Sequence, residues 1–190
     1  MPIVTNITLF MILAGSGFKD AQERRIPNKI TLTGIVIGWI LGLVTGGMTG
    51  LMQSLLGTLV GMAIFFLPFA LGGMGAGDVK LLGAVGSLMG WRFSLYTALY
   101  SALVGLVIVL YYLIRDGKVQ SVLRNIGYVI TTLLAKLFLQ YKFSDRLIQT
   151  QHQLAQKNRG YQKIYIPYGV AIAVGALFVW LMENGTYLTM

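Results

Sequence analysis

Two of the six acidic side chains stand where an apolar run meets a polar stretch. Asp20 follows the apolar run 2–17, and Asp78 precedes the apolar run 79–89. An acid at membrane depth is costly and usually serves a function. Two neighbouring carboxyl groups resist ionising together and can share one proton. One then takes a proton from water while the other donates one to a carbonyl group, which is the chemistry of hydrolysis.

The remaining acids have simpler interpretations. Asp116, Asp145 and Glu183 lie in polar loops or beyond an apolar run, and are predicted to be solvated. Glu23 is predicted to pair with Lys19 or with one of the arginines that follow it. Asp20 and Asp78, each taken alone, also fit a residue at a helix end, so their pairing depends on other features.

The segment GGMGAGD, residues 72–78, supplies such a feature for the second acid. Its glycines allow positive φ and a close approach to another helix or to a substrate. Non-helical backbone is tolerated in a membrane where it is buried in protein or lines a cavity. A helix that begins at Asp78 favours a carboxylate there, whereas the C-terminal end of the first helix disfavours one at Asp20. We therefore expect the two acids to differ in proton affinity.

Composition predicts the scaffold that must position these acids. Of the 190 residues, 56% are hydrophobic and 11% are charged, against about 25% charged in soluble domains. The 24 glycines fit tightly packed membrane helices. The absence of cysteine and the single His152 exclude disulfides, cysteine nucleophiles and zinc–thiolate or multi-histidine sites, so no metal or cofactor is predicted. The net charge of +9 comes from residues that flank apolar runs, which indicates orientation in a membrane rather than nucleic-acid binding.

The apolar runs predict an all-α integral membrane protein of about six spans, with the first run retained as a span. The runs are 2–17, 30–48, 51–71, 79–89, 93–114 and 165–182, with an uncharged loop at 45–50. If the loop after the first span is cytoplasmic, all of the 15 Lys and Arg residues except Arg92 face the cytoplasm. Both termini are then outside. The whole chain, 1–190, is predicted to be one domain.

A cytoplasmic insertion, 115–163, is predicted before the last span. Its apolar part, 126–141, carries Lys136 near the middle. A lysine at mid-membrane costs roughly 2.5–3.5 kcal/mol, so the favoured interpretation is an amphipathic helix on the membrane surface. A crossing helix is the alternative. It would move the basic residues of the polar connection 142–160 and Lys163 outside, against the charge pattern.

Three motifs resemble one known family. They are Asp20 with the following RRIPN (24–28), GAGDVKL (75–81) and IPYGVAIAVGAL (166–177). Together they resemble the type IV prepilin peptidases and archaeal preflagellin peptidases, the GxGD aspartyl proteases of membranes. The likeness extends from about residue 13 to about residue 180.

The resemblance implies an aspartyl endopeptidase that removes the short basic leader from pilin-like precursors at the cytoplasmic face of the cell membrane. It implies Asp20 and Asp78 as catalytic residues and Gly75 and Gly77 as motif glycines. Lys80 and Glu23 are expected in the adjoining loop that meets the substrate. Water is the co-substrate, and anionic lipid headgroups are expected to offset the basic face.

Two departures from the family pattern stand out. The cysteine-containing domain that large members associate with N-methylation is missing, so methylation is not expected. Val170 replaces the second proline of a common IPxGP motif, and we expect this to affect the local backbone only. Two other interpretations stay open: a proton- or ion-coupled transporter that uses the intramembrane acids, and a catalytically inactive assembly protein.

Overall fold

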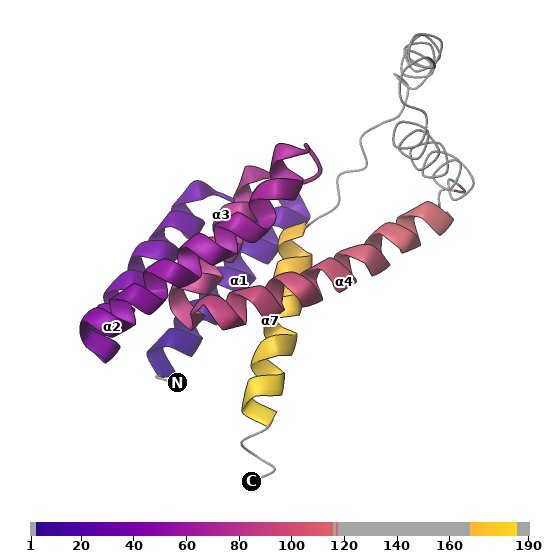
Figure 1. Ribbon diagram of the computed structural model, residues 1–190. Helices are drawn as coiled ribbons and strands as arrows, with labels where there is room; N and C mark the ends of the chain where they lie inside the picture. The colour runs from indigo at the N-terminus through magenta and orange to yellow at the C-terminus, as the bar shows by residue number, and fades with distance from the viewer. Residues whose placement is uncertain (1–2, 116, 118–167, 186–190) are drawn as a thin grey trace, which may run out of the picture. The chain divides into compact units, whose positions relative to one another are not determined.

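The computed structural model describes residues 3–115, 117 and 168–185. Within these residues the chain forms five α-helices (Figure 1): α1 (Ile3–Glu23), α2 (Asn28–Ala70), α3 (Ala76–Met89), α4 (Trp91–Arg115) and α7 (Tyr168–Gly185). The predicted all-α fold class is confirmed. Two compact units are present, one of 1–108 with 166–190 and one of 109–165. The predicted surface helix 126–141 and connection 142–160 lie outside the described residues, and the single domain with its insertion stays a prediction.

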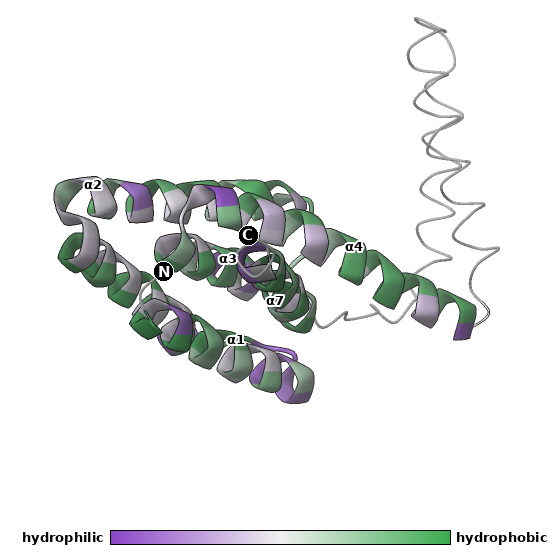
Figure 2. Ribbon diagram, turned by 90° about the horizontal axis from the view of Figure 1, so that it is seen from below, coloured by the Kyte–Doolittle hydropathy of each residue, from purple (hydrophilic) through white to green (hydrophobic). Residues whose placement is uncertain are grey.

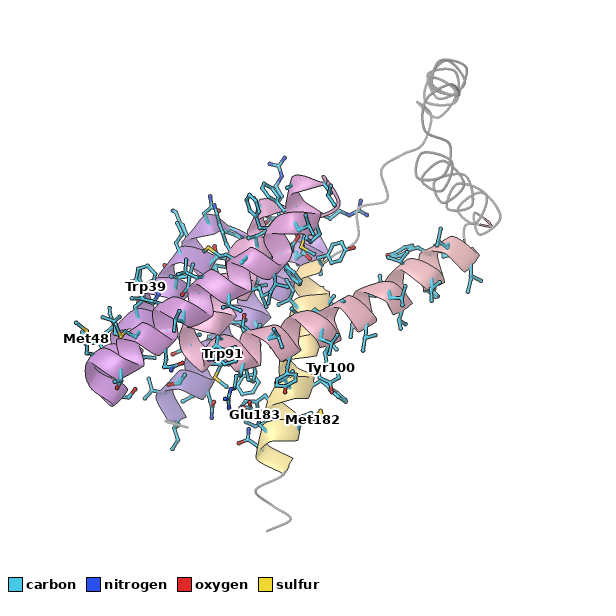
Figure 3. The ribbon with its side chains drawn as sticks, viewed as in Figure 1. Trp39, Met48, Trp91, Tyr100, Met182 and Glu183 are labelled. Atoms are coloured by element: carbon cyan, nitrogen blue, oxygen red, sulfur yellow. The ribbon has the colours of Figure 1, made fainter. Side chains whose placement is uncertain are left out.

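Helix α2 consists of two arms that fold back on each other, as Figure 1 shows. Its 43 residues contain one non-helical position, Gly47, with φ 58° and ψ −145°. The Trp39 indole N–H donates to Thr58 Oγ1 at 3.0 Å, and the Ser54 hydroxyl donates to the Gly38 carbonyl at 3.2 Å. Figure 3 labels Trp39 on the first arm and shows Met48 at the bend. The loop predicted at 45–50 is thus a break at one glycine, where positive φ allows a sharp reversal.

Small residues bring the arms of α2 close to α3. A Cβ atom at Gly57 would meet the carbonyl group of Gly86, and a Cβ at Gly86 would meet that of Gly57. At Gly61 a Cβ would lie 2.5 Å from the Leu82 carbonyl oxygen. Leu81 and Leu82 are fully buried beside this contact. Close backbone approach at small residues is how membrane helices gain packing energy.

Helix α7 completes this unit by packing against α1 and α4. The Phe10 and Trp180 rings stack edge to face with centroids 5.0 Å apart. The Tyr100 hydroxyl donates to Met182 Sδ at 3.3 Å, a pair that Figure 3 labels. The last described helix therefore contacts both α1 and α4.

The outward faces of the helices are strongly apolar. Figure 2 shows hydrophobic colour along most helices, with hydrophilic colour near the C-terminal end of α1. Among the described residues, two helices are long and apolar enough to cross a membrane, α2 and α4, and Tyr168–Asn184 is a shorter apolar helix. Length and hydropathy therefore do not support all six predicted spans. Helix α3 has only 14 residues, and α1 ends in a polar turn.

Candidate active site

Asp20 lies near the C-terminal end of α1, where it is 6% exposed. The Gly169 N–H donates to Asp20 Oδ2 at 2.7 Å, and the backbone N–H of Val170 also lowers the pKa of this carboxyl group. Both donors belong to the first turn of α7, whose N–H groups have no acceptor within the helix. The unfavourable end of α1 is thus offset by the favourable end of another helix. Asp20 does lie near the C-terminal end of α1, as predicted, and the N–H groups of α7 oppose the unfavourable effect of that helix end on a carboxylate.

Asp78 is the third residue of α3 and is 8% exposed. Its Oδ2 accepts the N–H of Gly75, the residue before the helix, at 3.1 Å. This is the carboxylate half of a capping box, in which a side chain at the third position satisfies the residue before the helix. A Cβ at Gly75 would lie 3.2 Å from Asp78 Oδ2, so glycine leaves room for the carboxylate.

Helices α1 and α3 are in contact, as the pairing of the two acids requires. Ile12 of α1 and Val79 of α3 belong to one buried cluster, and Leu13 and Val85 belong to another. The negative charge of Asp20 is one of the causes that raise the pKa of Asp78. The structure therefore places the two acids, which are distant in the sequence, on contacting helices.

The glycines before and at the start of α3 mainly allow another segment to pack closely against the backbone, and only Gly72 of them has a positive φ. Gly72 has φ 75°, but Gly75 has φ −83°, which any residue can adopt. At Gly77 a Cβ would lie 3.0 Å from Ile26 Cβ and 3.4 Å from the Ile26 carbonyl oxygen. Gly77 is thus the position at which the loop between α1 and α2 crosses the first turn of α3, next to Asp78.

This crossing gives a first prediction. Gly77→Ala should lower peptidase activity by about tenfold, because moving the loop by a few tenths of an ångström displaces the first turn of α3 and its acid, and a 1 Å misplacement can cost about a hundredfold. Gly73→Ala is the matched control, since a Cβ there would meet only the Pro68 carbonyl oxygen, at 3.4 Å. Initial rates of substrate cleavage measure the effect. Equal rates for the two variants would contradict this role of Gly77.

The other two predicted site residues have partners outside the pair of acids. Lys19 Nζ lies 2.6 Å from Glu23 Oε1 on the exposed side of α1, so Glu23 pairs with the lysine rather than with an arginine. Lys80 Nζ donates to Asn28 Oδ1 at 2.9 Å and links α3 to the start of α2. Their role toward a substrate stays a prediction.

Comparison with known proteins decides the family. A model of the type IV leader peptidase family matches residues 7–110. The chain belongs to this family. The resemblance drawn from the three motifs is confirmed, and membership in the type IV leader peptidase family makes the chain a peptidase. No curated protein and no solved structure matches it.

The stretch that defines this leader peptidase contains Asp20, Asp78 and the glycine turn, but it does not include α7. The Gly169 and Val170 N–H groups were therefore not expected near the acids. Val170 does more than affect the local backbone, because a proline at this position would have no N–H to donate. The motif IPYGVAIAVGAL (166–177) was the sequence signal for this contact, but it did not indicate that its N–H groups bind Asp20.

The surroundings of the two acids bias their protonation differently. Both lie just beyond the ends of the predicted apolar runs, and burial raises the pKa of each. At Asp20 the Gly169 and Val170 N–H groups oppose that rise. At Asp78 a single donor, Gly75, opposes the rise in pKa, while the charge of Asp20 adds to it. Burial and the charge of Asp20 together raise the pKa of Asp78 to about 7, so this carboxyl group can hold a proton near neutral pH.

Proposed function

We propose that this chain is a membrane-embedded aspartyl endopeptidase that removes the short basic leader from pilin-like precursors at the cytoplasmic membrane face. One observation carries the proposal. Asp20 and Asp78 are buried on contacting helices, each held by backbone N–H groups, in a chain of the type IV leader peptidase family.

The chemistry requires only the two acids and water. The ionised carboxylate removes a proton from water as its oxygen attacks the carbonyl carbon of the scissile peptide bond. The protonated acid donates its proton to the carbonyl oxygen, which gives a neutral tetrahedral intermediate. Collapse of the intermediate breaks the carbon–nitrogen bond as the amine takes the proton that the first carboxylate gained from water, and a hydroxyl group of the intermediate returns a proton to the second acid. The leader leaves with a new carboxyl group, and the mature protein keeps the new amino terminus.

Leader removal in cells tests this function. The chain is expressed with a pilin-like precursor that carries a basic leader before an apolar helix, and shortening of the precursor is followed on a gel. A second precursor, in which the residues at the cleavage point are replaced by proline, serves as a control because it cannot present an ordinary extended peptide bond. A precursor that stays at full length beside well-expressed, folded enzyme would refute the proposal.

We also propose six membrane crossings in this protein, counting the two arms of α2 separately. The break at Gly47 then lies outside and the loop after α1 lies in the cytoplasm, with both termini outside. The basic residues Arg24 and Arg25 of the loop after α1, and Lys29 at the start of α2, support this orientation. Anionic lipid headgroups on the cytoplasmic side are the proposed partners of these side chains.

Thiol labelling tests this topology directly, because the natural chain has no cysteine. With a membrane-impermeant maleimide added to intact cells, we expect G46C to be labelled and R25C to be protected until the membrane is opened. Both positions are exposed in the fold, so accessibility reports sidedness rather than burial. The reverse labelling pattern would require the opposite orientation.

No observation favours the transporter interpretation. A transporter needs acids or broken helices near the midplane of the membrane, whereas Asp20 and Asp78 lie at helix ends. Within the described residues, no group of three or more His, Cys, Asp or Glu side chains is placed to hold a metal ion.

A further inference from the structure

The first turn of α7 surrounds the carboxyl group of Asp20 with backbone rather than side chains. Gly169 is buried, and its N–H lies 2.7 Å from Asp20 Oδ2. A Cβ at Gly169 would lie 2.9 Å from both Cβ and Oδ2 of Asp20. The absence of a side chain thus lets the helix end approach the acid closely, and the next residue, Val170, contributes a second N–H.

Among the described residues, no Lys or Arg side chain forms an ion pair with Asp20. On α1, Lys19 is paired with Glu23. On α3, Asp78 carries like charge, and Lys80 is bound to Asn28. The loop after α1 and the start of α2 contribute Arg24, Arg25 and Lys29, all of which are exposed. The described residues of α7 contribute one acid, Glu183, near the other end of that helix. The oriented donors nearest to Asp20 are therefore the N–H groups of α7.

We propose that the first turn of α7 assigns the roles of the two acids. Through the N–H groups of Gly169 and Val170 it holds Asp20 ionised as the base that takes the proton from water, and it leaves Asp78 as the proton donor. The inference rests on the proposed function. Gly169 and Val170 act through Asp20, so they are positioning residues and touch no substrate.

Val170 offers a test, because proline is tolerated in the first turn of a helix and removes the N–H of residue 170. Val170→Ala keeps the N–H while it shortens the side chain, and it is the matched control. We expect V170P to raise the apparent pKa of the acidic limb of the kcat/KM profile by about one unit, since one lost hydrogen bond to a charged group is worth about that much. On that limb, the rate at a given pH falls about tenfold. The alkaline limb and KM should not change, and V170A should match the wild type.

A second readout does not depend on activity. In the full chain labelled with ¹³C at aspartate carboxyl carbons, Asp20→Asn and Asp78→Asn identify the two signals, and their chemical shifts are followed against pH. V170P should move the titration of Asp20 upward, and V170A should not. Gly169→Ala should lower kcat more than it changes KM, since its Cβ pushes the acid out of place.

The outcomes separate the two proposals. If the wild-type chain processes no precursor, the proposed function fails, while the carboxyl titration still tests the role of α7. If V170P and V170A have the same acidic limb and the same Asp20 titration, the role of α7 is wrong. A shift confined to the alkaline limb would reverse the assignment of base and acid.

Discussion

Replacing either acid by asparagine should abolish leader removal. We expect Asp20→Asn and Asp78→Asn each to lower the cleavage rate by about a thousandfold or more, since general acid–base catalysis contributes about 10²–10⁴ per group. An amide cannot take a proton from water, and it is too weak an acid to protonate the carbonyl group. Asparagine nevertheless keeps the oxygen that accepts a backbone N–H, so the bonds from Gly169 and Gly75 can persist.

The comparison needs a carboxylate that lies away from the site. Glu183→Gln is suitable, because this acid lies near the end of α7 opposite to Gly169. Cleavage of the same precursor is followed over time at equal amounts of membrane-inserted enzyme, and we expect Glu183→Gln to retain the wild-type rate. Wild-type cleavage by either aspartate variant would remove that acid from the mechanism.

The second large effect concerns folding. Gly57→Ala should destabilise the protein by about 3 kcal/mol, the upper part of the range for overpacking. The added methyl group would meet the backbone carbonyl of Gly86, which cannot rotate away as a flexible side chain can. The contact joins α2 to α3, the helix that carries Asp78, so part of the activity should be lost with the fold.

Gly46→Ala is the matched control, because it makes the same change in the same helix where nothing lies within 4 Å of the added Cβ. The fraction of monodisperse protein after heating in detergent measures both variants. A loss of 3 kcal/mol corresponds to a fall of roughly 6–12 °C in the midpoint for a chain of this size. Unchanged midpoints for both variants would show that α2 and α3 pack less closely than described.

Local patterns predicted much of this molecule. Apolar runs predicted helices, and the meeting of polar and apolar stretches predicted Asp20 and Asp78. The predicted apolar run 79–89 began three residues too late. The helix begins at Ala76, so Asp78 lies inside its first turn. Gly77 was expected to matter as a motif glycine. The physical reason, that Ile26 packs against it and leaves no room for a Cβ atom, is visible only in the structure.

The partner of Asp20 shows why sequence patterns reached only part of the site. A backbone N–H is present at almost every residue, so its usefulness at Gly169 depends entirely on where α7 begins in space. Charge patterns and apolar runs predict only the local structure of the segment that contains them. They carry no information on which helix end meets which side chain.

The bond between Gly169 and Asp20 also has a consequence for the timing of synthesis. It joins residues 149 positions apart, so a growing chain holds both acids long before it contains the first turn of α7. A ribosome-bound chain that stops before residue 169 has an incomplete hydrolytic centre. On the proposed mechanism, we therefore expect full peptide cleavage only when most of the polypeptide has been made and inserted.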